Sequence, residues 1–177
     1  MNKNELKSFL DEKVHQYNNP QFIESDPIQV PHAFTAKEDI EISGFLAATI
    51  AWGNRKMIIN NAKKLMDLMG SSPYDFIMSH EEHQLERFAS FVHRTFNATD
   101  CTCFIKSLKH IYTKHDGLEA VFASNAETDS LQKSISEFKK VFFEIEHQDR
   151  TQKHVSDPMS GSAAKRINMF LRWMVRN

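Results

Sequence analysis

Cysteine, glycine and proline are all scarce in this chain of 177 residues, which contains two, five and five of them respectively. The two cysteines, Cys101 and Cys103, are separated by one residue, a spacing that makes a poor disulfide and cannot supply a four-ligand metal site. Disulfide-stabilised scaffolds and zinc-finger modules are therefore excluded, and the pair is interpreted as structural. Unpaired cysteines are typical of a reducing compartment and predict a cytoplasmic protein.

Long apolar runs and the common enzymatic signatures are also absent. The polar start MNKNELKSF does not resemble a signal peptide, and no run of about 18 apolar residues could form a membrane span. There is no Gly-rich phosphate loop and no nucleophile elbow. We therefore expect no membrane association, and the sequence predicts no metal site and no cofactor.

Helical periodicity extends along most of the chain. The apolar share of 41% and the 14 Phe residues suffice for an aromatic-rich core, and the length suits one domain covering residues 1–177. Residues 18–34 are expected to form a long loop, because three of the five prolines cluster there. The expected helices cover about 5–17, 35–52, 55–69, 79–92, 102–115, 129–145 and 162–176, with a short helix beginning at Pro73. The chain is thus predicted to be all-α.

Two local patterns support individual helices, and periodicity selects the core. Thr35 and Glu38 have the spacing of a capping box at the start of the second expected helix. The apolar stripe of the third helix is Ile58, Ala62, Leu65, Met66 and Met69. The predicted core residues are Phe45, Leu46, Ile58, Leu65, Leu108, Phe138, Phe142, Phe170 and Leu171.

Charge is distributed unevenly, although the whole chain carries only −1. Residues 150–177 contain six basic residues and one acidic residue, Asp157, so this segment carries +5 and the rest of the chain carries −6. The asymmetry indicates either a local anion-binding face or a solvated basic helix end. The basic residues of the last expected helix are Lys165, Arg166, Arg172 and Arg176.

The histidine pairs have simpler interpretations. His80 and His83 have the wrong spacing for the two ligands of a metalloprotease helix, and their acidic neighbours indicate a solvated helix start. His110 and His115 lie five positions apart and do not share a helical face, so the sequence assigns them no role.

One segment, residues 158–168, differs from this background. It is a tight Pro/Ser/Gly turn that leads into a basic amphipathic helix. Backbone N–H groups at such a turn, with the positive end of the helix behind them, suit a phosphate group, and Lys165 would lie close to that anion. The alternative is an ordinary loop in which Ser160 or Ser162 caps the helix.

The stretch GSAAKRINMFL resembles the hairpin motif of endonuclease III-type, helix-hairpin-helix DNA glycosylases, which has the form G-x-G-x-K-T-A-N followed by apolar residues. Gly161 matches the first glycine, Lys165 the lysine and Asn168 the asparagine. FLAATIAWGNR and the following NNAKKL resemble a helical pair of the same fold, whose connecting turn probes the DNA. The resemblance implies double-stranded DNA as the partner. It implies DNA contacts from Asn54, Arg55, Gly161, Ser162, Lys165 and Arg166.

The chain is also similar, over nearly its whole length, to an uncharacterised bacterial family of helical proteins related to these glycosylases. That similarity implies a fold but no activity. Ala163 stands where the motif has its second glycine, and Trp52-Gly53-Asn54-Arg55 replaces the usual Gln-containing probe. The family's catalytic aspartate and its iron–sulfur cysteines would follow Asn177, because Asp157 precedes the hairpin. We therefore expect the chain to be the N-terminal part of a longer glycosylase-like protein.

Three functions are compatible with these patterns. The first is a DNA glycosylase or abasic-site lyase, which flips a base from the stack and uses Lys165 as the catalytic nucleophile. The second is a non-catalytic DNA- or RNA-binding relative, because the aspartate that would stabilise the sugar cation is absent from these residues. The third is a helical protein-interaction module whose basic end has no ligand. Salt-dependent DNA binding separates the first two from the third.

The lyase hypothesis predicts a covalent product. Lys165 would form a Schiff base with an abasic-site duplex, and borohydride would trap the adduct in the longer protein. Lys165→Gln should abolish the adduct, and Arg166 cannot substitute because a guanidinium stays protonated. Gel electrophoresis of labelled duplex measures the adduct. Trapping by the Lys165→Gln variant would assign the nucleophile to another residue.

Overall fold

The computed structural model describes residues 1–175, and the chain is mainly helical over this range. The α-helices are α1 (Lys3–Tyr17), α2 (Pro20–Ser25), α3 (Lys37–Thr49), α4 (Arg55–Leu68), α5 (Pro73–Ser79), α6 (Ala98–Lys114), α7 (Leu118–Ala123), α8 (Gln132–Phe142) and α9 (Lys165–Met174). The 3₁₀ helices are η1 (Pro27–Gln29), η2 (Pro31–Ala33), η3 (Glu82–Phe88), η4 (Asp149–His154) and η5 (Pro158–Ser160). Within the described range, extended structure is limited to the antiparallel pair β1 (Val92–His93) and β2 (Phe96–Asn97). The all-α prediction is confirmed, and no helix in this range is long and apolar enough to cross a membrane.

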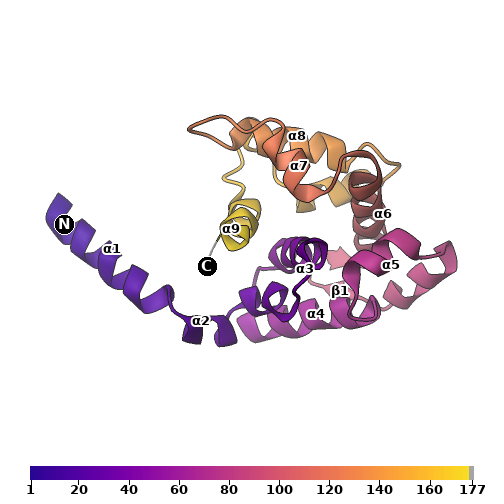
Figure 1. The fold of residues 1–177 in the computed structure, drawn as a ribbon, viewed down its shortest axis with the longest axis horizontal. Helices are drawn as coiled ribbons and strands as arrows, with labels where there is room; N and C mark the ends of the chain where they lie inside the picture. Colours follow the sequence, from indigo (N-terminus) through magenta and orange to yellow (C-terminus); the bar gives the residue numbers. More distant parts are fainter. Residues whose placement is uncertain (176–177) are drawn as a thin grey trace.

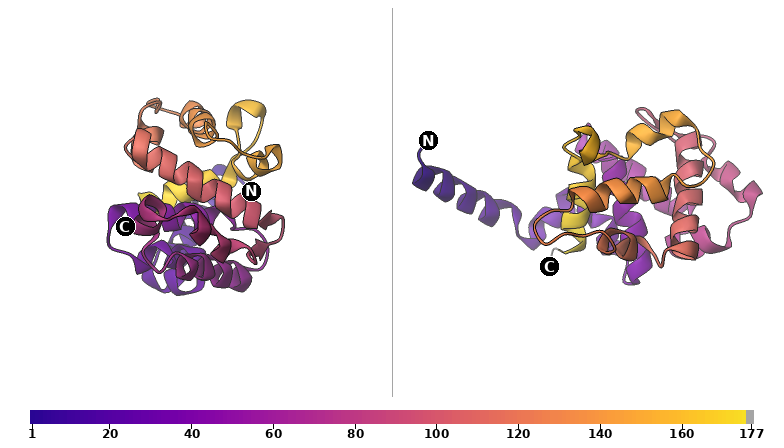
Figure 2. Two further views of the ribbon diagram at one scale, coloured as in Figure 1. Left: turned by 90° about the vertical axis from the view of Figure 1, so that its right-hand side faces the viewer. Right: turned by 90° about the horizontal axis from the view of Figure 1, so that it is seen from above.

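The helices form two layers with α9 between them (Figure 1). One layer holds α3, α4 and α5, the other holds α7 and α8, and α6 connects the layers at one end. The views in Figure 2 agree with this arrangement. The last helix, α9, packs against α3, and η5 packs against α8. One face of α9, carrying Ile167, Phe170 and Trp173, is therefore part of the interior.

The core is built around Phe45 in the middle of α3. Its ring lies 5.4–5.8 Å from four other phenylalanine rings, which come from α6, α8 and α9. These rings belong to Phe104, Phe138, Phe142 and Phe170. Eight of the nine predicted core residues are buried, and Leu171 is half-buried. The periodicity therefore identified the core faces correctly.

Gly44 permits the close approach of α9 to α3. A Cβ atom at this position would lie 2.8 Å from Cε of Met174 and 3.5 Å from the ring of Phe170. A Cβ atom here would displace the flexible end of the Met174 side chain and make an ordinary contact with Phe170.

Three predicted helix boundaries were wrong. The second expected helix begins at Lys37, its N-cap residue is Ala36, and no side chain caps it, so the Thr35–Glu38 capping box does not form. It ends at Thr49 rather than near residue 52. The expected loop 18–34 contains α2, η1 and η2, because each of its three prolines occupies the first position of a short helix, where its missing N–H costs nothing.

The expected helix over 79–92 is instead the 3₁₀ helix η3 followed by β1. Val92, the last residue of that expected helix, lies in β1 and is 60% exposed. At the end of the chain, α9 begins at Lys165 rather than Ser162, because Gly161 and Ala164 adopt left-handed backbone conformations that a helix cannot continue through. Arg176, assigned to the basic face of this helix, lies outside the described residues.

The first helix, α1, extends away from the two layers (Figure 1). None of its residues is buried, and its apolar positions, including Leu6, Phe9 and Leu10, are 42–51% exposed. Its ordering comes from local features, such as the capping box between Asn2 and Glu5.

Glu41 brings a carboxyl group into the interior of α3. It is 7% exposed and accepts a hydrogen bond of 2.7 Å from the hydroxyl of Tyr112, while Nζ of Lys37 lies 3.8 Å from its other oxygen. Burial raises the pKa of Glu41, against the opposing effects of Tyr112 and Lys37. The folded protein therefore holds this proton more tightly than the unfolded chain does.

Because the folded pKa is raised, Glu41 stabilises the fold below its unfolded pKa of about 4.3, and that contribution is lost as pH rises through the folded pKa. Glu41→Gln keeps the acceptor for Tyr112 without the charge. We expect its free energy of unfolding, relative to the wild type, to rise between acid and neutral pH, because only the wild type must bury a charge there. Urea unfolding at several pH values measures this, with the exposed Glu24→Gln as control. A difference that does not change with pH would contradict the prediction.

Candidate functional site

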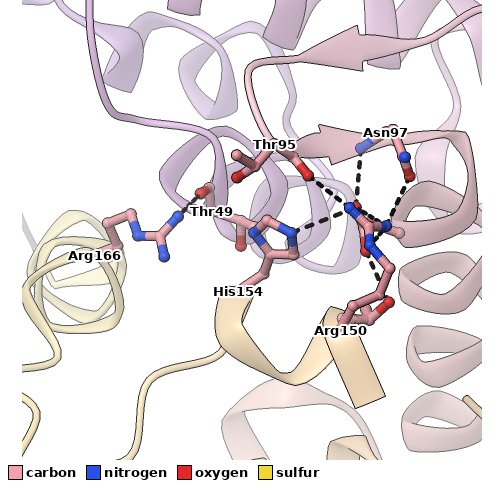
Figure 3. A network of polar contacts seen from close by, with 8 residues as sticks. Thr49, Thr95, Asn97, Arg150, His154 and Arg166 are labelled. Carbon is pink, nitrogen blue, oxygen red and sulfur yellow. Dashed lines mark hydrogen bonds and ion pairs between the residues drawn. The ribbon is translucent and has the colours of Figure 1, made fainter. Parts of the chain in front are cut away.

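A buried polar cluster surrounds Asp100 in the first turn of α6 (Figure 3). Asp100 is 0% exposed, and its Oδ2 accepts a hydrogen bond of 3.0 Å from the backbone N–H of Asn97. In return, the side chain of Asn97 accepts a hydrogen bond from the backbone N–H of Asp100, the third residue of the helix, which completes a capping box. The sequence Asn97-x-x-Asp100 is thus the signal that starts α6.

Two neighbouring residues of η4 neutralise and satisfy this carboxylate. Nη1 of Arg150 lies 2.9 and 3.0 Å from the two oxygens of Asp100, and Oγ1 of Thr151 donates to Oδ1 at 2.7 Å. Arg150 also donates to the side chain of Asn97 and to the carbonyl of Thr95, both at 3.0 Å. A buried charge needs such partners. The cluster therefore fastens η4 to the start of α6 and to the β1–β2 turn.

His154, at the end of η4, lies on the other side of Asp100. Its Nε2 is 3.4 Å from Oδ2 of Asp100 and, although buried, makes no hydrogen bond. Burial lowers the pKa of His154, and the nearby Asp100 opposes this effect. The basic neighbours that also lower this pKa are Lys153, Arg166 and Arg150. Positive charges in this region therefore oppose protonation of this buried imidazole.

Trp52 joins this cluster to α9. The guanidinium of Arg166 lies 4.7 Å from the centre of the Trp52 ring, and His154 stacks on the same ring at 6.0 Å. Arg166 also donates to the carbonyl of Thr49, the last residue of α3, and burial lowers the pKa of Arg166. Arg166 therefore holds the start of α9 against the end of α3.

His93 of β1 also contacts Trp52, and the two rings pack edge to face with their centres 5.2 Å apart. The side-chain amide of Asn61 donates to its Nδ1 at 2.8 Å, which leaves Nε2–H to donate to the carbonyl of Trp52 at 3.3 Å. The next residue, Arg94, lies against Gly53, where a Cβ atom would be 2.6 Å from its Nη1. Gly53 has a φ of +107°, so the α3–α4 loop favours glycine here for its backbone conformation.

The structure brings some of the predicted DNA-binding residues together. Asn54 is exposed, and it caps α4 by accepting a hydrogen bond of 3.1 Å from the N–H of Met57. Arg55 is exposed, with its guanidinium 5.7 Å from the ring of Phe22. Since Trp52 contacts Arg166, the α3–α4 loop that carries Asn54 and Arg55 meets the start of α9.

The predicted turn takes a tight form. Gly161 has a φ of +83°, and Gly161, Ser162 and Lys165 are all exposed. Ala164 adopts a left-handed conformation with a φ of +44°, and the side chain of Asn168 donates to its carbonyl at 3.2 Å. The motif asparagine therefore braces the turn.

Neither serine of the turn caps α9. Oγ of Ser162 accepts from the N–H of Ala164, Ser160 donates to Asp157, and α9 begins without a side-chain cap. The alternative interpretation, an ordinary serine cap, is therefore wrong. The turn is preceded by the 3₁₀ helices η4 and η5 rather than by an α-helix, which departs from the helix-hairpin-helix pattern.

The structure shows where the side chains of Arg166 and Lys165, two of the predicted DNA-binding residues, lie. Arg166 points inward onto Trp52, so its charge serves the fold as well as the surface. Lys165 is the first residue of α9, and its side chain faces solvent. The role of Lys165 as a nucleophile stays a prediction.

Sequence reasoning missed the centre of the cluster. Asp100, Arg150 and His154 received no role, because the helix containing Asp100 was expected to begin at residue 102. The capping pattern at Asn97 and Asp100 was a signal that could have identified the correct start. The partners in η4 lie about 50 residues away in sequence and carry no such signal.

Comparison with known proteins gave one family match. No curated protein and no solved structure matches the chain. A family model described as "Protein of unknown function (DUF2400)" matches residues 26–177, which include the α3–α4 loop, the Asp100 cluster and α9. Since this match covers most of the chain and leaves only α1 and α2 outside it, the chain belongs to the DUF2400 family.

Proposed function

We propose that this protein binds double-stranded DNA through the phosphate backbone, as a DNA-repair-like protein of the glycosylase type. The binding surface consists of the α3–α4 loop, the β1–β2 turn and the start of α9. Its exposed residues are Asn54, Arg55, Arg94, Gly161, Ser162 and Lys165. The two unpaired, buried cysteines support a reducing, cytoplasmic setting for such a protein.

The observation that carries the proposal is the uncapped start of α9 beside the α3–α4 loop. No side chain caps this helix, so its first turn offers N–H groups without a side-chain acceptor at the positive end of the helix dipole. A phosphate oxygen is a suitable acceptor for these groups. The contact of Arg166 with Trp52 and Thr49 fixes this helix start relative to the loop.

The charges nearby favour an anion. Arg94 lies against the loop at Gly53, and the charges of Lys153, Arg150 and Arg166 act on His154. Asp100 balances one of these charges, because it pairs with Arg150. The remaining positive charge supports binding of a polyanion without requiring recognition of a base.

Lys165 provides the clearest test, because its side chain is exposed and its loss should leave the fold intact. Binding of a fluorescent duplex of arbitrary sequence is measured by anisotropy at several salt concentrations. We expect a dissociation constant of about 10⁻⁴–10⁻⁶ M near physiological salt that weakens as salt rises. Lys165→Gln should lower the magnitude of the log–log salt slope by about 0.9, because one phosphate contact is lost. Arg55→Gln should act similarly.

Lys114→Gln is the matched control. Lys114 is exposed at the last residue of α6, and Asp100 lies in the first turn of the same helix. A rise of about 1.5 Å per residue separates them by about 20 Å, so this control removes an equal charge far from the proposed surface. Equal losses in the Lys165, Arg55 and Lys114 variants would contradict the proposed surface. Affinity that does not depend on salt would favour the protein-interaction alternative.

A further inference from the structure

Two histidines and a glutamate converge at the opposite end of α6 from Asp100. His110 lies in the last part of α6, His115 is its C-cap residue, and Glu144 follows the end of α8. The Nε2 of His110 is 2.8 Å from Oε2 of Glu144, the Nε2 of His115 is 3.2 Å from the same oxygen, and the two Nε2 atoms are 3.3 Å apart. These are the ligand types of a transition-metal site.

The structure corrects the sequence interpretation of this pair. Five positions along a continuous helix would separate the two histidines by roughly 140°, since each residue turns about 100°. The helix ends at Lys114, however, and His115 has a φ of −133°, which directs the chain out of the helix. The side chain of His115 can then meet that of His110, and their ring centres are 5.1 Å apart.

We propose that His110, His115 and Glu144 bind a divalent transition-metal ion, with Zn²⁺ as the best-suited ion. In a tetrahedral zinc site with Zn–N and Zn–O bonds of about 2.0–2.2 Å, the ligand atoms lie about 3.3–3.5 Å apart. Two of the three observed separations, 3.2 and 3.3 Å, agree closely, and the third, 2.8 Å, requires an opening of about half an ångström for this geometry. Two imidazoles and one carboxylate favour zinc over Mg²⁺ or Ca²⁺, which prefer oxygen ligands.

The geometry also explains why an ion would be stabilised here. Three nitrogen or oxygen atoms face one point, and both imidazoles approach the same carboxylate oxygen. If each imidazole donates Nε2–H to Glu144, two N–H groups face each other across 3.3 Å, which is unfavourable. A cation at the centre accepts all three lone pairs and removes that conflict. The side chains are 25%, 30% and 46% exposed, so the ion has a path from solvent and room for a water molecule as the fourth ligand.

The cysteines do not compete for this ion. Cys101 and Cys103 are buried, and burial raises the pKa of both thiols, whereas metal binding requires the thiolate. Within the described residues, the His110–His115–Glu144 group is the one set of three or more potential ligands whose atoms all approach within 4.8 Å.

The test is a titration of the untagged, chelator-treated protein with zinc chloride, followed by isothermal titration calorimetry. We expect one Zn²⁺ per chain, and Co²⁺ in its place should give the visible absorption of a low-coordinate site. His110→Gln, His115→Gln and Glu144→Gln should each weaken binding by at least about tenfold, a loss of the size measured when partners of a metal site are removed. Circular dichroism of the metal-free variants should match the wild type, because all three side chains are partly exposed.

His83→Gln is the matched control. His83 is exposed and its Nδ1 lies 3.2 Å from Glu81, so it forms a histidine–glutamate pair without a second histidine. The His83→Gln variant should bind Zn²⁺ with the affinity of the wild type. The proposal is overturned if no zinc binds, or if all three cluster variants bind as tightly as the His83 variant, which would place the ion elsewhere in the chain.

Discussion

Asp100 carries a carboxylate into a part of the protein from which water is excluded. Such a group is stable only with hydrogen bonds and a compensating charge, and these come from the backbone of Asn97, from Thr151 and from Arg150. The first of these partners is local, and the other two lie about 50 residues further along the chain. The hydrogen bonds and the ion pair that Asp100 requires therefore fix the position of η4 against the start of α6.

The positions of the candidate interface follow from that return. His154 ends η4 beside Asp100 and stacks on Trp52, which also contacts Arg166 at the start of α9. Arg166 in turn donates a hydrogen bond to the carbonyl of Thr49, which fixes its position. A loop and a helix start more than 110 residues apart in sequence thus meet at one surface, and the charges that remain exposed there favour a polyanionic partner.

Local signals in the sequence predicted the parts of this fold that depend on local physics. The stripe from Ile58 to Met69 is buried as expected, because periodicity alone determines which face of α4 meets the core. Thr35 did not cap α3, since a capping pattern competes with the backbone path that η2 imposes. His110 and His115 meet because a helix ends between them, and Asp100 meets Arg150 because the whole chain folds back. Neither contact produces a periodic pattern in the sequence, so neither could be predicted from it.

The most direct test of this account is amide hydrogen exchange in Asp100→Asn, which keeps the size of the side chain and removes the charge. If Asp100 holds η4 and thereby the start of α9, the amides of residues 149–168 should lose protection by about tenfold or more, equivalent to at least about 1.4 kcal/mol. The amides of α4, which packs in the other layer, should keep theirs. Unchanged protection over residues 149–168, or an equal loss along the whole chain, would contradict the central role of this carboxylate.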